Sequence, residues 1–165
     1  MCLMTGPRNV LFLCTGNSAR SILAEAILRH YGGGRYQAFS AGSMPAGTPN
    51  PAAIATLESH GLDHSFARSK SWDEFAGDAA APMDLVVTVC SNAAGEVCPV
   101  WPGHPHTVHW GVEDPAAVIG SRQDVMAAFS VTYDQMKARV DALLALGEAP
   151  LADLMPKIRE IGNLP

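Results

Sequence analysis

The sequence carries little charge and contains no long hydrophobic run. Charged residues make up 16% of its 165 residues, and the formal net charge at pH 7 is −5. No apolar run reaches the roughly 20 residues that a membrane-spanning helix needs. A mildly acidic chain also lacks the basic face on which non-specific nucleic-acid binding depends. We therefore expect neither a membrane protein nor a nucleic-acid-binding protein, although one local anion site is compatible with this composition.

The sequence also shows no secretory signal, and it has four cysteines. The first residues, MCLMTGPRN, show no basic region, apolar stretch and cleavage site, so we expect a cytoplasmic protein. The four cysteines are Cys2, Cys14, Cys90 and Cys98. In a cytoplasmic chain such cysteines are more often reduced, reactive or metal-binding than joined in structural disulfides. Cys2 stands in the terminal stretch and is treated as incidental.

Internal repeats, linkers and low-complexity segments are absent, and strand-like segments alternate with helix-like ones. The length and the 48% hydrophobic content fit one domain spanning residues 1–165. The apolar patterns predict strands at 9–14, 36–41, 84–90 and 107–112, and helices at 18–31, 52–60 and 125–147, with shorter ones after Ser71 and at 151–161. This alternation predicts an α/β fold with a four-stranded parallel sheet and helices on both faces.

Three reactive side chains stand near the ends of predicted strands. Cys14 and Cys90 each end a strand, and Asp114 comes shortly after another. Ligands of doubly wound sheets bind at the carboxyl ends of the strands. We therefore expect these three residues to meet at one edge of the sheet, although they are far apart in the sequence.

The segment from Cys14 to Arg20 has the pattern of an anion-binding loop. A tight turn from a buried strand into a helix directs successive backbone N–H groups into one concavity. Gly16 would permit close backbone approach or unusual dihedral angles, and the Arg20 guanidinium would grip two oxygens of a tetrahedral anion. These positive surroundings predict a lowered pKa for the Cys14 thiol, and a thiolate there is a nucleophile. The alternative is a buried strand cysteine, a helix cap at Ser18 and a surface arginine.

The stretch VLFLCTGNSARS at 10–21 resembles the phosphate-binding loop of the low-molecular-weight protein tyrosine phosphatase family. SAG at 40–42 and EDPA at 113–116 resemble other motifs of that family. The resemblance implies the family's four-stranded parallel sheet flanked by helices. It also implies that Cys14 is the nucleophile and Asp114 the general acid. The substrate-binding residues that it implies are Thr15, Gly16, Asn17, Ser18, Ala19, Arg20 and Ser21.

The same resemblance implies residues that support the loop. Asn17 and Ser40 have counterparts that bond to each other, and Ser21 matches a serine that bonds the thiolate. Ordinary turn and capping roles are the alternative for these polar side chains. Some relatives bind a potassium ion with an acidic residue at the position of Lys70. We expect the Lys70 ammonium to replace that cation by bracing Asn17 or Ser40, and we expect no metal requirement.

Two features resemble the arsenate reductase branch of this family rather than its phosphatases. Tyrosine phosphatases of the family carry aromatic residues directly after Asp-Pro, whereas Asp114-Pro115 is followed here by two alanines. Thioredoxin-coupled arsenate reductases carry a cysteine pair in the segment that holds Cys90 and Cys98. The resemblance therefore implies arsenate and other tetrahedral oxyanions as ligands, and a role in arsenic resistance and detoxification. We expect no bound cofactor and a monomeric protein.

The implied reaction is a cysteine relay. Cys14 attacks arsenic, Asp114 protonates the departing oxygen, and Cys90 then attacks the Cys14 sulfur. Cys98 takes over the disulfide, and thioredoxin, or glutaredoxin with glutathione, reduces it. The spacing between Cys90 and Cys98 is one residue longer than in the best-known thioredoxin-coupled enzymes, which leaves the reductant open. Ala19 stands where much of the family has a second cysteine in the loop.

Three alternatives remain. Cys14, Arg20 and Asp114 would suffice for a phosphatase that hydrolyses small or tyrosine phosphate esters. A zinc site is a second alternative, but its spacing is not a standard one and Pro105 separates two of the histidines. Its ligands would be Cys90, Cys98, His104, His106 and His109. A third is an oxyanion sensor whose cysteines report redox state, with Cys90 otherwise a buried apolar residue and Cys98 a stray loop thiol.

Overall fold

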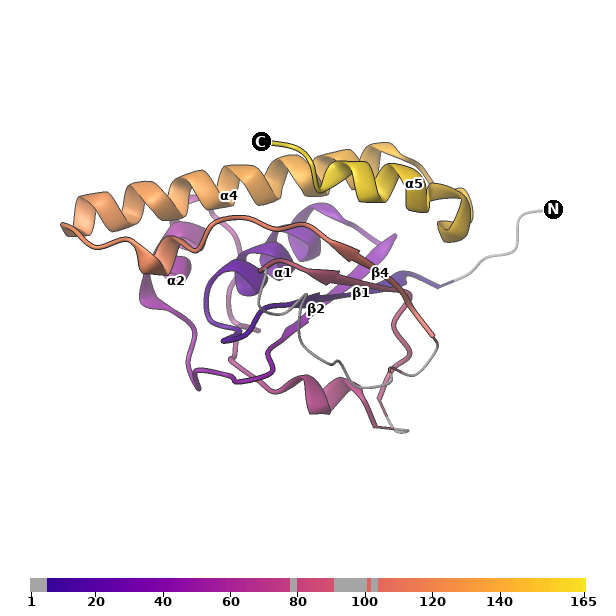
Figure 1. Ribbon diagram of the computed structural model, residues 1–165, viewed down its shortest axis with the longest axis horizontal. Coiled ribbons are helices and arrows are strands. Elements are labelled where there is room, and N and C mark those ends of the chain that lie inside the picture. The colour runs from indigo at the N-terminus through magenta and orange to yellow at the C-terminus, as the bar shows by residue number, and fades with distance from the viewer. Residues whose placement is uncertain (1–5, 78–79, 91–100, 102–103) are drawn as a thin grey trace.

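The computed structural model describes residues 6–77, 80–90, 101 and 104–165. Four strands form one parallel sheet in the order β2-β1-β3-β4 (Figure 1). They are β1 (Arg8–Leu13), β2 (Tyr36–Ala41), β3 (Leu85–Thr88) and β4 (His106–His109). The four-stranded parallel sheet predicted from the sequence is confirmed.

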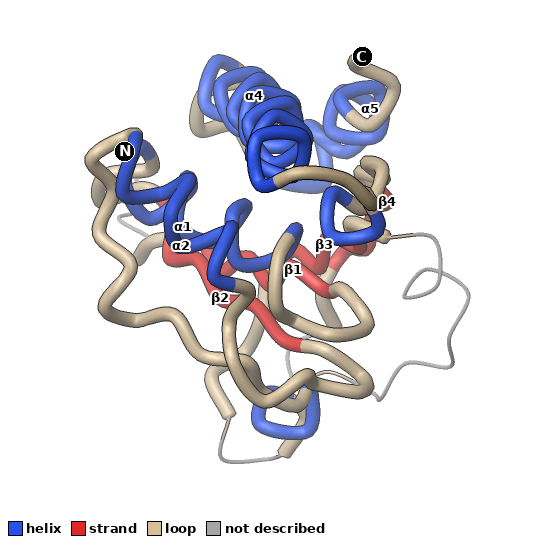
Figure 2. The backbone as a smooth tube through the Cα atoms, turned by 90° about the vertical axis from the view of Figure 1, so that its left-hand side faces the viewer, coloured by secondary structure: helices blue, strands red, loops and turns tan. Residues whose placement is uncertain are grey.

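Helices lie on both faces of the sheet, as predicted. The α-helices gather on one side and the short 3-10 helix η1 lies on the other (Figure 2). On the α-helical side the Trp110 indole donates a hydrogen bond to the Ile158 carbonyl oxygen, and on the other side Phe39 packs against Phe75. The helices are α1 (Arg20–Tyr31), α2 (Pro51–Ser59), η1 (Trp72–Phe75), η2 (Pro115–Ala117), α4 (Arg122–Ala145) and α5 (Leu151–Ile161).

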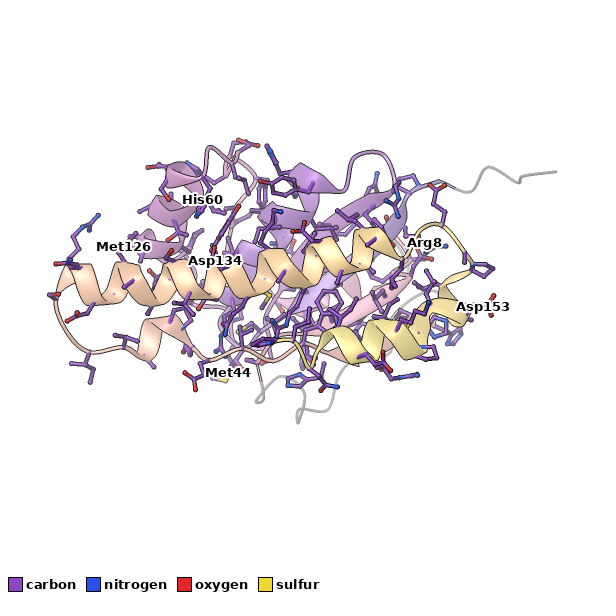
Figure 3. The ribbon with its side chains drawn as sticks, turned by 90° about the horizontal axis from the view of Figure 1, so that it is seen from above. Arg8, Met44, His60, Met126, Asp134 and Asp153 are labelled. Atoms are coloured by element: carbon purple, nitrogen blue, oxygen red, sulfur yellow. The ribbon has the colours of Figure 1, made fainter. Side chains whose placement is uncertain are left out.

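The centre of the sheet is the core. Residues Val10 to Leu13 of β1 are fully buried, which is what an apolar strand covered on both faces requires. Seen from above, α4 crosses the molecule with α5 beside it, and Asp134 and Asp153 mark the two helices (Figure 3). In the parts of the chain that the structure describes, no helix has the length and apolar character to cross a membrane.

Of the two strands that lead to the site, β3 is shorter than the predicted segment, and β1 has the predicted length but begins and ends one residue earlier. β3 ends at Thr88, yet Val89 still donates a backbone hydrogen bond to the Leu13 carbonyl oxygen at 2.9 Å. The first α-helix begins at Arg20 rather than at Ser18 because the intervening residues form a loop of their own. That loop and the end of β3 lie side by side because β1 and β3 are neighbours in the sheet.

Candidate active site

The loop after β1 turns its carbonyl oxygens outward. The carbonyl oxygens of Thr15, Gly16 and Ser18 accept hydrogen bonds from outside the loop. The backbone donors are Met44 N (3.0 Å), Ala46 N (2.9 Å) and Asn50 N (2.8 Å), in the same order. In a trans peptide the N–H points opposite to the carbonyl group. The following N–H groups therefore point into the loop, where they form a concavity suited to an anion.

Glycine acts at a different position than the sequence predicts. A β-carbon on Gly16 would meet only Ser18 Oγ, at 3.7 Å, which is an ordinary contact. The residue with positive φ is Asn17, at 44°, and asparagine tolerates this left-handed region. Close approach instead occurs at Gly42, where a β-carbon would overlap the carbonyl oxygens of Cys14 and Thr15. Gly16 therefore has neither a positive φ nor a close protein neighbour, and Gly42 lets the loop pack against the end of β2.

The side chain of Asn17 ties the loop to three neighbours. It is fully buried, and its amide donates hydrogen bonds to Ser40 Oγ and Ser21 Oγ, both at 2.9 Å. Its Oδ1 accepts a hydrogen bond from the Lys70 backbone N–H at 2.9 Å. The Asn17–Ser40 bond implied by the resemblance is therefore present. These bonds fix the loop from its buried side.

A buried ion pair lies behind this bond, and sequence reasoning missed one of its members. Glu25 of α1 is 1% exposed and accepts a hydrogen bond from Ser40 Oγ at 2.5 Å. Lys70 Nζ lies 3.3 Å from Ser40 Oγ and 3.7 Å from Glu25 Oε1, and burial lowers the pKa of its ammonium group. Arg29 donates to the other carboxylate oxygen of Glu25 at 3.2 Å. An acidic residue inside the apolar stretch SILAEAIL was the available signal.

Arg20 is placed to bind an anion at the loop. Its Nη1 donates a hydrogen bond to the Val112 carbonyl oxygen at 3.1 Å, and Nη2 lies 3.5 Å from Asp114 Oδ2. Within the described residues, its buried Nε has no hydrogen-bond partner. Asp114 is itself held by a turn, because its Oδ1 accepts a hydrogen bond from Ala116 N at 3.0 Å at the start of η2. The cation and the predicted general acid thus stand together.

Cys14 and Cys90 meet at the base of the site. Their exposed fractions are only 6% and 3%. The hydrogen bond with Cys90, followed by burial, raises the pKa of the Cys14 thiol, although Arg20 and a backbone hydrogen bond at Gly16 act in the opposite direction. The predicted lowering of this pKa is therefore wrong, because the sequence pattern of the loop does not include Cys90. Thr15 Oγ1 also lies 3.7 Å from Cys90 Sγ.

A cavity of about 580 Å³ opens beside these groups. Among the described residues that line it there is no Phe, Tyr or Trp, in line with the alanines that follow Pro115. Its charged and reactive lining residues are Arg20, Cys90, His109, Glu113 and Asp114.

The predicted relay and the zinc alternative both include Cys98, which the structure does not describe. Cys98 lies outside the described residues, so its predicted position in the relay is not part of this geometry. Over residues 6–77, 80–90, 101 and 104–165, His, Cys, Asp and Glu side chains form no group of three or more that could hold a metal ion.

Comparison with known proteins identifies the family. Residues 9–153 match the model of the family described as low molecular weight phosphotyrosine protein phosphatase. The chain belongs to this family. The resemblance carried by the loop, SAG and EDPA motifs is thus confirmed.

The relatives within this family include arsenate reductases. An arsenate reductase of Bacillus cereus is 42% identical over 145 residues, which cover 88% of this chain and all of the relative. The solved structure of an arsenate reductase in the phosphate-binding state matches with a TM-score of 0.69 at 29% identity, covering 84% of this chain and 98% of that one. A thioredoxin-dependent arsenate reductase of Corynebacterium glutamicum matches with a TM-score of 0.56 at 27% identity, covering 84% and 64% of the two chains.

Proposed function

We propose that this protein is an arsenate reductase in which Cys14, Cys90 and Cys98 form a relay. The observation that carries the proposal is the second buried thiol, Cys90, in hydrogen-bond contact with Cys14. Ester hydrolysis needs one cysteine at this point, whereas reduction needs a second sulfur that can attack the first. The arsenate reductases among its relatives support this assignment.

The first step forms a bond between sulfur and arsenic. Arsenate binds to the backbone N–H groups of the loop and to Arg20, whose Nε has no acceptor among the described residues and can donate to an arsenate oxygen. The Cys14 thiol carries its proton before arsenate binds, because its pKa is raised. As the Cys14 sulfur attacks arsenic, this proton and a hydroxyl group of arsenate leave together as water. Asp114 passes this proton from the Cys14 sulfur to the departing oxygen.

The second step transfers two electrons to arsenic. The Cys90 sulfur attacks the Cys14 sulfur, so an S–S bond forms and the S–As bond breaks. The electron pair of the S–As bond stays on arsenic, which passes from the pentavalent to the trivalent state and leaves as arsenite. The Cys90 proton is released in this step.

The third step moves the disulfide to Cys98. The Cys98 thiolate attacks Cys90, which frees Cys14 for another turnover and leaves a Cys90–Cys98 disulfide. Reduction of that disulfide needs two electrons and two protons from an external dithiol. Thioredoxin is the first candidate, because one relative is described as thioredoxin-dependent. Glutaredoxin with glutathione is the second.

We also propose that Lys70 takes the place of a bound cation. Its ammonium group reaches Ser40 Oγ and the buried Glu25 carboxylate, and its backbone N–H bonds the amide of Asn17. An internal positive charge at this position neutralises Glu25 and holds the loop without a metal ion.

The test is arsenite formation by single cysteine variants with thioredoxin and glutaredoxin systems. Cys14→Ser and Cys90→Ser should form no arsenite, and Cys98→Ser should stop after one turnover with a trapped Cys14–Cys90 disulfide. The matched control is Cys2→Ser, which should keep wild-type turnover. Wild-type turnover by Cys90→Ser or Cys98→Ser would contradict the relay.

A phosphatase is the second candidate, favoured by the presence of Cys14, Arg20 and Asp114 in one site. Hydrolysis of p-nitrophenyl phosphate by the wild-type protein, lost in Cys14→Ser, together with no arsenite formation under any condition, would favour this candidate.

A further inference from the structure

The cavity contains a histidine that has no role in the steps above. His109, the last residue of β4, lines the cavity together with Cys90, Arg20 and Asp114. In the sheet His109 pairs with Thr88, and Cys90 stands two residues beyond Thr88. Pairing continues past both strands, because Val112 N donates to the Val89 carbonyl oxygen at 3.3 Å. The imidazole and the Cys90 thiol therefore share the carboxyl end of the β3–β4 pair.

The contacts of Thr88 accommodate the tautomer in which Nδ1 of the imidazole carries the proton. Its Oγ1 lies 2.8 Å from His109 Nδ1 and donates to the Val108 carbonyl oxygen at 3.4 Å. A hydroxyl group has one proton to donate, so with that proton on the carbonyl oxygen it accepts from Nδ1–H. The neutral ring then carries a lone pair on Nε2, the nitrogen that can take up a proton.

Gly111 leaves room for this nitrogen. A β-carbon at position 111 would lie 2.6 Å from His109 Nε2 and 3.1 Å from Cε1, closer than side chains approach. Any larger residue there would displace the ring. Thr88 thus contacts Nδ1, and Nε2 lies against Gly111, which lines the cavity together with His109.

We propose that His109 Nε2 accepts the proton of the Cys90 thiol as Cys90 attacks Cys14. This inference deepens the proposed reduction and rests on it. The Cys90 S–H bond breaks and its proton passes to Nε2. The sulfur then forms the S–S bond with Cys14, and the electron pair of the S–As bond goes to arsenic. The proton leaves His109 with the departing arsenite.

Charged side chains from two other segments line the cavity beside the imidazole. Glu113 and Asp114, in the segment after β4, and Arg20, at the start of α1, line the same cavity. Among the described residues of the lining, Cys90, after β3, is the remaining titratable group, and the segment after α5 contributes Gly162.

The first experiment measures Cys90 without arsenate. In a Cys14→Ser background, the rate of Cys90 alkylation by iodoacetamide is followed across a pH series, with peptide mass spectrometry to separate Cys90 from Cys2 and Cys98. His109→Asn keeps an N–H group for Thr88 but has no basic atom. We expect this variant to slow alkylation at pH 7 by about tenfold, which corresponds to about one pH unit in the profile. Identical profiles with and without His109 would overturn the proposal.

The second experiment measures the step itself. In a Cys98→Ser background, a single turnover with arsenate yields the Cys14–Cys90 disulfide. We expect His109→Asn to lower its maximal rate at pH 7 by roughly 100-fold, with the loss shrinking at alkaline pH. The half-saturating arsenate concentration should stay within about twofold, because His109 acts after binding. An equal rate at every pH would overturn the proposal.

Thr88 provides the control for the positioning of the ring. Thr88→Val should reproduce part of the loss seen for His109→Asn, and Thr88→Ser, which retains the hydroxyl group, should restore the rate and the pH profile. If the wild-type protein forms no arsenite, the proposed function fails, and the alkylation profiles still decide the role of His109.

Discussion

Replacing Asn17 by alanine tests whether one buried amide holds the anion-binding loop. The side chain is fully buried and makes three hydrogen bonds, to Ser21, to Ser40 and from the Lys70 backbone. At about 1 kcal/mol for each bond, their loss removes about 3 kcal/mol. Alanine at a φ of 44° adds about 1 kcal/mol of backbone strain. The expected decrease in unfolding free energy is thus about 4 kcal/mol, or a fall in Tm of roughly 8–16 °C.

Urea denaturation followed by circular dichroism measures this change, and titration calorimetry with phosphate measures the loop. Asn17→Gly is the matched control, because it loses the same three bonds without the strain. It should be about 1 kcal/mol more stable than Asn17→Ala. Both variants should bind phosphate more weakly than the wild-type protein. A loss below about 1 kcal/mol in Asn17→Ala, with unchanged phosphate affinity, would refute this reasoning.

Three further predictions concern titrating groups. Cys90→Ala should lower the pKa of Cys14 by removing the hydrogen bond that is the main cause of its increase. Alkylation of Cys14 should then begin at lower pH, and an unchanged profile would count against this cause. Burial lowers the pKa of Lys70 in the folded protein below its ordinary value of 10.5. At pH values between the lowered pKa and 10.5, the unfolded chain therefore binds more protons than the folded one. Wild-type stability in urea should therefore rise with pH in that window relative to Lys70→Met, and parallel curves would argue against it. Asp114→Asn can still cap η2 but cannot donate an acidic proton, so kcat for arsenate reduction should fall about 100-fold with Tm kept within about 2 °C. Unchanged kcat would exclude the acid role.

The elements that position the site could be predicted because their signals are local. The apolar run of β1 requires burial on both faces, and the change to helical spacing after it predicts a turn at the edge of the sheet. Parallel strands end at the same edge, so Cys14 and Cys90 were expected to lie close together. The structure places them in hydrogen-bond contact.

The residues that shape the loop could not be predicted in the same way. The local pattern around Gly16 predicts unusual dihedral angles or close backbone approach at that residue. The positive φ of the loop instead belongs to Asn17, and the close approach between backbone segments occurs at Gly42. The need for glycine at position 42 arises only when the end of β2 packs against the loop after β1. A sequence pattern around either segment does not contain that contact.

The buried environment of the charged residue Glu25 could not be predicted from the local sequence either. Its position on α1 is compatible with a solvated helix face, and only the tertiary structure places it against Ser40 and Lys70. A buried carboxylate needs such partners, because removing it from water is costly without a compensating charge and hydrogen bonds. The long-range contact with Lys70, rather than the helical pattern, determines its burial.

The hydrogen bond between Cys14 and Cys90 gives the proposed relay its order. Thiol–disulfide exchange requires a thiolate, and the raised pKa of Cys14 keeps that thiol protonated before arsenate binds. Formation of the S–As bond consumes the Cys14 proton and ends its hydrogen bond with Cys90. At the same time the Cys14 sulfur acquires a leaving group that it did not have before, a pentavalent arsenic that departs in the trivalent state. Cys90 therefore attacks only after arsenic is bound, and a proton acceptor is then required at Cys90 itself, on the side of the cavity where His109 lies.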